Sequence, residues 1–415
     1  MWKKKIVVVI GIEVAAVILL AALLSFEKYS ESGNENTTTG NIQSAQGGTL
    51  SESMQDEWVN QEYKEKTETE EKMDEETEEK ERKEKERKEK ETKEKETESQ
   101  EKDFIKWVEF NVTSEAMKQA YEYDVESYGE ELHLDWIDLL AILGAKYGGD
   151  FDSYRAKEMS EIAEKLLSGE CTVEEYTEDM QYFAYYREAY GAVLGGMVGE
   201  YRIQCKSNTT SQSEEKEWKR YYGLKAFSPI AKGFPYTDYD DFGVSRSYGY
   251  QRNHLGHDMM GQVGTPIIAT ESGKVTALGW NQYGGWRIGI ESFDGLRYYY
   301  YAHLRQNRPY AEGLEVGDIV QAGDVIGYLG RTGYSIKENV NNIDEYHLHF
   351  GLQLIFNESQ REGNNEIWVN GYELVKFLSQ NRSEVQRNDE TKEWTRVYQI
   401  EDPAVEQYLS EKQSK

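Results

Sequence analysis

The chain has 415 residues and a formal net charge of -29, because 77 acidic residues outnumber 48 lysines and arginines. Nucleic-acid binding requires clustered Lys and Arg side chains, so this charge argues against that class of function. The length is sufficient for two or three folded domains. Changes in composition predict a multidomain chain with these parts: a cytoplasmic tail (1–5), a transmembrane signal anchor (6–26), a linker with a low-complexity segment rich in Glu and Lys (27–103), an all-helical domain (104–206), a second linker (207–222), an antiparallel all-β domain (223–381) and a polar tail (382–415).

An apolar segment near the amino terminus is long enough to cross a membrane. Residues 6–26 are mostly Ile, Val, Leu and Ala, and three lysines precede them. About 20 apolar residues span a bilayer as an α-helix, and lysines on one flank keep that flank inside the cell. A cleaved signal peptide is the alternative, although no clear small-residue cleavage site follows the segment. We expect an uncleaved anchor, with the rest of the chain outside the cell membrane.

The next segment has the composition of a tether. Residues 27–63 are rich in Ser, Thr, Asn and Gly, and residues 64–102 consist almost entirely of Glu, Lys, Arg and Thr. Several acidic residues precede a basic residue by four positions, as Glu81 precedes Lys85, and this spacing supports a helix. The segment lacks an apolar heptad seam, which argues against a dimeric coiled coil. A frayed charged helix and a disordered tether both remain compatible with the sequence.

Apolar runs with helical spacing follow the tether and predict a small all-helical domain. They lie at residues 116–125, 132–143, 159–167 and 173–194. Thr172 and Glu175 have the spacing of a capping box, which marks the start of a helix. The sequence of this domain contains no convincing catalytic pair of carboxylates, and a role in binding a protein partner is a hypothesis only.

Cys171 and Cys205 are the two cysteines of the chain. A location outside the cell membrane permits a disulfide between them, and closing a loop of this length would stabilise the fold by roughly 4 kcal/mol. The sequence leaves both the bridged and the free state open.

From Thr265 onward the pattern changes to short apolar runs that are separated by glycines. The length of these runs predicts an antiparallel all-β unit. They lie at residues 266–270, 274–280, 287–291, 296–303, 319–322, 325–329 and 347–354. Residues 368–379 have the pattern of a terminal helix, and we expect the polar residues after Asn381 to be mobile.

Five of the six histidines gather in three short segments of this β unit. The segments are His254-Leu-Gly-His-Asp258, Tyr301-Ala-His303 and His347-Leu-His349. Neutral imidazole and carboxylate groups suit zinc, and a catalytic zinc ion keeps three protein ligands and one open position. A set of two histidines and one carboxylate is therefore available.

Alternation along a strand determines which of these side chains can meet. His347 and His349 lie on one face of the predicted strand 347–354, and its leucines lie on the other. Both histidines then point into the same cleft. By the same alternation, His303 shares a face with Tyr301.

The segment before the β unit is expected to be extended, because Gly256 argues against a helix. An extended backbone places His254 and Asp258 on one side and His257 on the other. We therefore expect that His257 is not a metal ligand, and the same holds for His133, which lies outside the three segments.

The sequence from about Phe242 to Phe356 resembles the lysostaphin-like, or LytM-type, zinc endopeptidases of bacterial cell walls. The motifs that carry the resemblance are, in chain order, FGVSRSYG, H-x-x-x-D, GTPIIATESGKV, YAHL, VGDIVQAGDVIGYLGRTG and H-L-H-F. An isolated H-x-x-x-D motif would be weak evidence, whereas several ordered motifs at separations like those of the family are specific. The resemblance implies a compact β-sheet domain with a zinc ion in an open groove.

The resemblance also implies roles for five residues. His254, Asp258 and His349 would bind one zinc ion, and His303 and His347 would be the catalytic residues that act on the substrate. His347 is suited to accept the proton of the attacking water, and His303 to stabilise the oxyanion or to protonate the leaving amine. The two histidines can exchange these roles.

Together, location and resemblance imply a zinc metalloendopeptidase that hydrolyses peptide cross-links or stem peptides of peptidoglycan. Candidates to line its groove are Tyr283, Trp286, Tyr301 and Tyr334, although aromatic residues on strands more often pack in a core. Residues 334–345 form a longer loop than the family usually has, which could narrow or cover the groove.

A non-enzymatic function is the alternative. Some proteins of this fold have lost metal ligands and act as activators of wall hydrolases or as parts of envelope assemblies, for example in sporulation or division. The intact set of four histidines and Asp258 argues against a purely structural role. An assembly role alongside activity remains open.

Overall fold

The computed structural model describes residues 104–206, 216–247 and 251–413. The expected cytoplasmic tail, membrane anchor and charged linker, residues 1–103, lie outside the described residues. Within the described ranges, no helix combines the length and the apolar character needed to cross a membrane.

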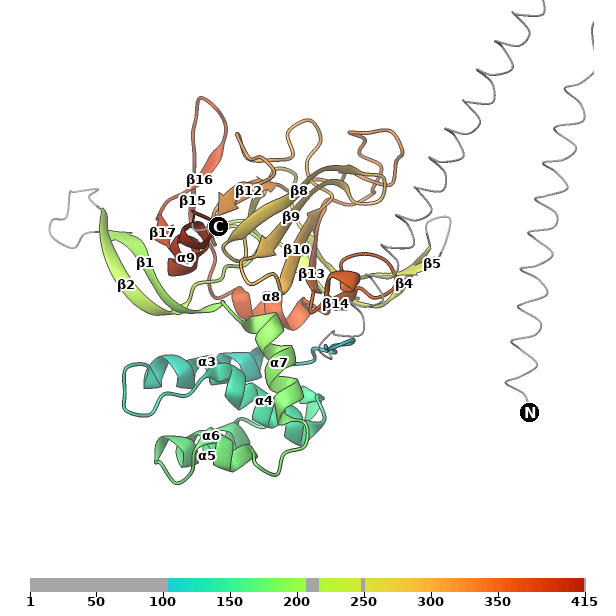
Figure 1. Cartoon of the computed structure of the whole chain (residues 1–415). Coiled ribbons are helices and arrows are strands. Elements are labelled where there is room, and N and C mark those ends of the chain that lie inside the picture. Colours follow the sequence, from blue (N-terminus) through green and yellow to red (C-terminus); the bar gives the residue numbers. More distant parts are fainter. Residues whose placement is uncertain (1–103, 207–215, 248–250, 414–415) are drawn as a thin grey trace, which may run out of the picture. The chain divides into compact units, whose positions relative to one another are not determined.

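An antiparallel sheet of eight strands forms the centre of the β unit (Figure 1). Its order is β11, β8, β9, β10, β13, β6 and β3, and β14 also pairs with β13. The strands are β3 (Thr237–Asp238), β6 (His257–Met260), β8 (Gly273–Asn281), β9 (Gly285–Ser292), β10 (Arg297–Ala302), β11 (Ile319–Val320), β13 (His347–Leu354) and β14 (Ile367–Val369). Two smaller pairs join β7 (Pro266–Ile268) to β12 (Val325–Tyr328) and β4 (Ser245–Ser247) to β5 (Gln251–Asn253). The predicted antiparallel β unit is confirmed.

The two faces of this sheet differ because side chains alternate along each strand. In β13, Leu348 and Phe350 are buried in the core, and His349 between them faces the opposite side. In β10, Tyr299 and Tyr301 are buried, whereas Tyr300 is half-buried and packs edge-on against His349, at 6.0 Å between ring centroids. One face thus builds the core and the other carries polar groups.

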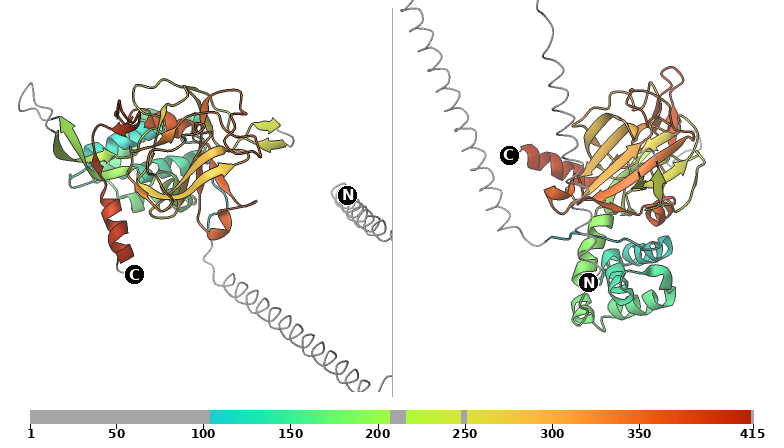
Figure 2. Two further views of the ribbon diagram at one scale, coloured as in Figure 1. Left: turned by 90° about the horizontal axis from the view of Figure 1, so that it is seen from above. Right: turned by 90° about the vertical axis from the view of Figure 1, so that its right-hand side faces the viewer.

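The helices between residues 114 and 194 precede the sheet in the chain and lie together at one end of it (Figures 1 and 2). They are α3 (Ser114–Ser127), α4 (Trp136–Tyr147), the 3-10 turn η1 (Phe151–Ser153), α5 (Ala156–Leu167), α6 (Val173–Thr177) and α7 (Phe183–Leu194). The predicted capping box of Thr172 and Glu175 is confirmed at the start of α6. The single run expected over 173–194 is divided into α6 and α7.

The helices share one hydrophobic core with the sheet. Helix α8 (Tyr372–Leu378) lies at this junction, where Phe377 contacts the rings of Tyr121 and Trp136 at 5.9 and 5.7 Å between centroids. A single cluster of buried residues runs from Val108 in the helical part to Leu378. The helix expected over 368–379 is observed as the shorter helix α8, because residues 368 and 369 belong to β14.

The second predicted linker is wrong for residues 216–222. They belong to β2 (Lys216–Leu224), which pairs in antiparallel fashion with β1 (Val198–Lys206), and β17 (Ile400–Glu401) extends this small sheet. Most side chains of β2 are exposed, so the segment lacks the apolar alternation that indicates a strand. Residues 207–215 between the two strands lie outside the described residues.

The expectation of a mobile polar tail is also wrong. Residues 382–413 contain β15 (Val385–Arg387), β16 (Trp394–Arg396), β17 and α9 (Pro403–Gln413). Asp402 is buried and forms an ion pair of 2.7 Å with the buried Lys225. Arg396 is buried as well and donates a hydrogen bond to the carbonyl oxygen of Ala322. Polar side chains thus hold residues 382–413 against the β unit. The low hydrophobicity of this segment therefore does not make it mobile.

The two cysteines are free thiols in the structure, so the optional disulfide is not formed. Cys171 packs against the core of the helical part. Cys205 lies on β1, where its sulfur is 3.6 Å from the hydroxyl of Tyr221.

Arg297 forms a buried ion pair within the β unit and a hydrogen bond that connects the sheet to α7. Its Nε lies 2.8 Å from Glu271 Oε2, and its Nη1 donates a hydrogen bond to the carbonyl oxygen of Ala192. We expect Arg297→Ala to lower the free energy of unfolding by about 3–5 kcal/mol, because Glu271 would stay buried without its cation. Denaturant unfolding monitored by circular dichroism measures this loss.

A matched control is Lys157→Ala, which breaks an exposed ion pair with Glu161 on α5. Such pairs contribute about 0.3–0.5 kcal/mol. If the two variants lost similar stability, the buried ion pair of Arg297 with Glu271 would not contribute the stability assigned to it.

Candidate metal centre

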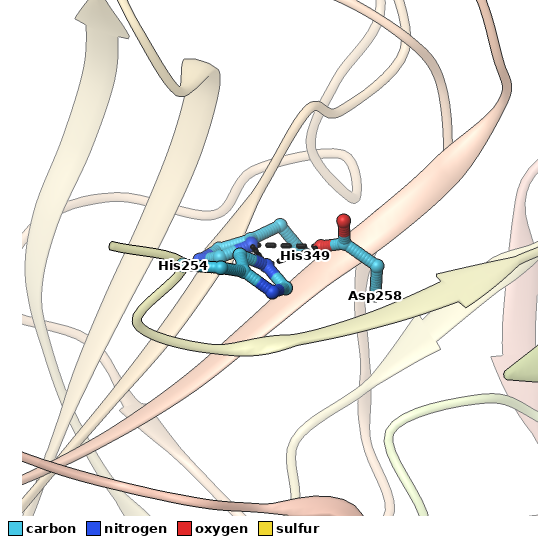
Figure 3. A group of neighbouring side chains, drawn as sticks. All are labelled: His254, Asp258 and His349. Atoms are coloured by element: carbon cyan, nitrogen blue, oxygen red, sulfur yellow. Dashed lines mark hydrogen bonds and ion pairs between the residues drawn. The ribbon is translucent and has the colours of Figure 1, made fainter. Parts of the chain in front are cut away.

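Three side chains from two parts of the sheet converge on one point (Figure 3). His254 Nε2 lies 3.0 Å from Asp258 Oδ1 and 3.0 Å from His349 Nδ1, and His349 Nδ1 lies 2.8 Å from Asp258 Oδ1. Within the described ranges, these residues form the group of His, Cys, Asp or Glu side chains whose geometry could hold a metal ion. The structure thus brings together the three ligands expected from the sequence.

Strand pairing produces this convergence. Asp258 on β6 is directly opposite His349 on β13 in the antiparallel register. His254 lies in the turn before β6 and reaches the same face, whereas His257 points to the other face and pairs with Asp238 at 2.9 Å. The expectation that His257 is not a ligand agrees with this geometry.

The donor set suits zinc. Nitrogen and oxygen ligands of a tetrahedral zinc ion lie about 2.0–2.2 Å from the metal, which requires separations of roughly 3.3 Å between donors. The observed triangle of 2.8 to 3.0 Å would have to open by only a few tenths of an ångström. The residues present therefore fit the ion that the family resemblance implies.

The charge states also suit a cation. Burial alone would raise the pKa of Asp258, but hydrogen bonds with His254 and His349 hold the pKa of this carboxyl well below its usual range. Burial lowers the pKa of His349, although Asp258 opposes that effect. A carboxylate and a neutral imidazole are the forms that bind metals.

Two residues that the sequence analysis missed contact the ligands from behind. His254 Nδ1 lies 3.3 Å from the carbonyl oxygen of Asp241 and 2.9 Å from its Oδ1. Arg246 donates to Asp258 Oδ2 at 2.8 Å and also pairs with Asp241. Such contacts orient metal ligands and select the histidine tautomer. Arg246 belongs to the segment FGVSRSYG, and Asp241 directly precedes it. Their contacts with the ligands arise only in the folded chain.

Gly256 permits the close approach of His349. A Cβ atom at this position would lie 2.5 Å from His349 Nε2 and 3.1 Å from the carbonyl oxygen of Phe350. We expect Gly256→Ala to displace the His349 ring and to weaken zinc binding by roughly 10- to 100-fold, similar to the loss of an outer-shell contact. Competition with a chromophoric chelator measures this affinity.

Gly191→Ala is the matched control, because this glycine lies within α7 with open space around an added Cβ atom. Its zinc affinity should equal that of the unchanged chain. Equal affinities for the two variants would contradict the role assigned to Gly256.

The other two histidines lie beside the ligands. His303 and His347 are both buried, with 4.7 Å between their ring centroids, and His347 Nε2 lies 3.7 Å from Asp258 Oδ2. His303 Nδ1 donates to the carbonyl oxygen of Thr332 at 3.0 Å, and His347 Nδ1 donates to that of Glu345 at 3.1 Å. A carbonyl oxygen can only accept, so each Nδ1 carries a proton, and Nε2 is the nitrogen that is bare in the neutral form of each ring.

His303 reaches this position because its backbone leaves the strand. Its φ of 61° is left-handed, a conformation that histidine adopts more readily than most residues with a Cβ atom. The alternation expected from the sequence, with His303 and Tyr301 on one face, therefore fails at the end of β10. Burial, together with His347 and His349, holds the pKa of His303 well below its ordinary value, so the ring is neutral.

A cleft of about 690 Å³ opens next to the ligands and contains His254 and His349 in its wall. Among the four aromatic candidates, Tyr283 lines this cleft. Tyr301 does not, because it is fully buried and hydrogen-bonds to Thr270, so the expectation for Tyr301 is wrong. On β10, Tyr298 and Tyr300 line the cleft instead.

The remaining two candidates lie outside the wall of this cleft. Trp286 is half-buried and donates its indole N–H to Asn339, so its ring serves packing. Tyr334 lies 5.9 Å from the ring of His303 and carries the guanidinium of Arg252 over its own ring at 5.2 Å. Tyr334 therefore remains next to the histidines.

The long loop over 334–345 is held against the domain by hydrogen bonds. The indole N–H of Trp280 donates to the carbonyl oxygen of Ser335, and Asn339 accepts from both Trp286 and the backbone of Asn307. The loop therefore contacts Trp280 and Trp286, and none of its residues lines the cleft.

Comparisons with known proteins match this region. A model of peptidase family M23 matches residues 252–362. The L-Ala–D-Glu endopeptidase of Bacillus subtilis (strain 168) is 34% identical over 184 residues, which cover 42% of this chain and 54% of that protein. Lysostaphin of Staphylococcus staphylolyticus is 40% identical over 98 residues, which cover 23% of this chain and 18% of that protein. The catalytic domain of lysostaphin from Staphylococcus simulans is 31% identical, with a TM-score of 0.27, over 34% of this chain and 92% of that structure.

The chain thus spans about half, or less, of the length of these curated relatives. The matched residues contain the three convergent side chains His254, Asp258 and His349, together with His303 and His347. Residues 252–362 are a domain of peptidase family M23, homologous to the L-Ala–D-Glu endopeptidase, to lysostaphin and to peptidoglycan hydrolases of the LytM type.

Proposed function

We propose that the protein is a zinc-dependent endopeptidase that hydrolyses peptide bonds of peptidoglycan cross-links or stem peptides. One observation carries the proposal: three metal-binding donors within 3.0 Å of one another lie beside two histidines with bare Nε2 atoms. The homologues support the substrate class, because homologues in peptidase family M23 are peptidoglycan endopeptidases and one relative is named an L-Ala–D-Glu endopeptidase.

His254, Asp258 and His349 would hold the ion. When bound, zinc would supply a Lewis acid for the scissile carbonyl group and would lower the pKa of water. Asp241 and Arg246 keep the two ligands that they contact in place.

His347 and His303 supply the proton transfers. Because each Nδ1 donates to a carbonyl oxygen, Nε2 is the atom of each ring that accepts a proton and later donates it. We assign the first acceptance, from the attacking water, to His347, whose Nε2 lies 3.7 Å from Asp258 Oδ2. The accepted proton is then available for the leaving amine, and the closely packed His303 can share this transfer.

The site of action proposed is the outer side of the cell membrane. The apolar residues 6–26 and the three lysines before them support a single-pass anchor with the M23 domain outside. Protease treatment of intact spheroplasts tests this: cleavage of the domain supports an outer location, and full protection contradicts it.

The decisive experiment combines metal analysis and wall hydrolysis. The purified full chain should contain about one zinc ion, release soluble fragments from purified peptidoglycan and lose this activity with a chelator. Added zinc should restore the activity. A chain that binds zinc but releases nothing from any peptidoglycan would contradict the enzyme and favour a regulatory protein of the same fold.

A further inference from the structure

Two half-buried arginines of the cleft have no anionic partner among the described residues. Arg252 on β5 and Arg287 on β9 line the same cleft as His254 and His349. Both Nε atoms are buried and have no hydrogen-bond partner. Among the described residues, no carboxylate oxygen lies within 4.0 Å of either guanidinium group. Both side chains are half-buried and no carboxylate of the described residues neutralises them, so a ligand that brings an anion would be stabilised here.

The other arginines near the cleft show that pairing is readily available in this chain of net charge -29. Arg361 lines the cleft too, but it lies 2.8 and 3.1 Å from the two oxygens of Glu291 and 2.7 Å from Glu358. Arg246 pairs with Asp258 and Asp241. Arg252 and Arg287 therefore differ from their neighbours in the same acidic protein.

The position of Arg287 relates it to the reacting centre. Ile288 of β9 lies opposite Tyr301 of β10, so the preceding residue, Arg287, lies beside Ala302 of β10. Ala302 in turn lies opposite His349 of β13. Two strand spacings, roughly 10 Å, thus separate Arg287 from His349 along the sheet. An extended peptide covers this distance with about three residues.

Arg252 is connected to the catalytic histidine His303 through Tyr334. Its guanidinium stacks over the ring of Tyr334, at 5.2 Å from the centroid, and donates to the tyrosine hydroxyl. Tyr334 in turn lies 5.9 Å from the ring of His303. The stacking holds the guanidinium without neutralising its charge.

We propose that Arg252 and Arg287 form a carboxylate-binding subsite, which selects acidic peptides whose carboxylate lies within about three residues of the cleaved bond. The planar guanidinium group binds a carboxylate through two parallel hydrogen bonds. A peptide made of glycine would leave both cations unpaired. The inference rests on the proposed endopeptidase function and names its substrate class.

A matched pair of peptides tests the subsite. One is L-Ala–γ-D-Glu–L-Lys–D-Ala with a free α-carboxylate on its glutamate, and the other carries a carboxamide at that position. Binding to the zinc-free full chain is measured by calorimetry, so the result does not depend on hydrolysis. The acidic peptide should bind roughly 10- to 100-fold more tightly than the amide, as expected for a hydrogen-bonded charge.

Variants assign this preference to the arginines. R287Q and R252Q should each remove most of the preference, and R287K, which keeps the charge but loses the planar fork, should retain part of it. R361Q is the matched control, because this arginine of the cleft already has anionic partners. Thermal unfolding of each variant verifies that the fold is retained.

Several outcomes would overturn the subsite. These are equal binding of the two peptides, binding of neither, or a preference that persists in the double variant of Arg252 and Arg287. If the acidic peptide binds selectively but no bond is cleaved with zinc present, the subsite stands and the endopeptidase function fails.

Discussion

Asp258→Ala is expected to abolish zinc binding and with it all measurable hydrolysis. Asp258 supplies the one anionic donor of the triangle and contacts both His254 and His349 at 3.0 and 2.8 Å. Its removal leaves two neutral imidazoles, which hold a divalent cation much more weakly than a set that includes a carboxylate. The loss should exceed the roughly 10- to 100-fold reduction in affinity that follows the loss of an outer-shell contact.

Metal content by mass spectrometry and release of soluble wall fragments together measure this effect. His133→Ala serves as the control, because His133 pairs with Asp124 in the helical part, outside the cleft. The control should retain zinc and activity. An Asp258 variant that still contained a full equivalent of zinc would show that the ion is held elsewhere.

His347→Ala and His303→Ala are each expected to retain zinc and to lose about 10²- to 10⁴-fold in kcat, the usual contribution of general acid–base catalysis. Both rings lie beside the ligand triangle, but their donors are not part of it. If the two rings share one proton pathway, the double variant should be little worse than the poorer single variant, because residues that act as a unit are not additive.

The comparison needs zinc content and turnover from the same preparations. Loss of zinc in either single variant would contradict the separation of ligands from proton carriers. Unchanged turnover in both variants would show that neither histidine takes part in catalysis. The assignment of the metal ligands would not be affected.

Alternation within strands was a reliable guide where a strand continues and failed where it ends. Within β13, the period of two correctly separated His347 and His349 from the leucines. At the end of β10, the backbone of His303 is left-handed and its ring lies beside His347 and His349, while Tyr301 stays in the core. A change of one backbone angle is invisible in the pattern of residue types, and the wrong expectation for Tyr301 follows from it.

Segments without apolar periodicity were the ones interpreted wrongly. Residues 216–222 and 382–413 are polar, and polarity normally indicates a linker or a mobile end. In the fold they are held by strand pairing and by buried ion pairs such as that of Lys225 with Asp402. The partners lie 177 positions apart, so local sequence contains no signal of the pairing.

The residue types and their spacing alone determined that two histidines and one carboxylate were available as metal ligands and which strands carry them, and the family resemblance selected His254, Asp258 and His349 among them. Ligand chemistry is a property of side chains, and a two-residue period assigns them to a face. Only the tertiary structure decided which groups surround that set: Asp241 and Arg246 behind it, Arg252 and Arg287 along the cleft, and a helical part that shares the core. These relations depend on distances between remote segments, and such distances arise only when the chain packs.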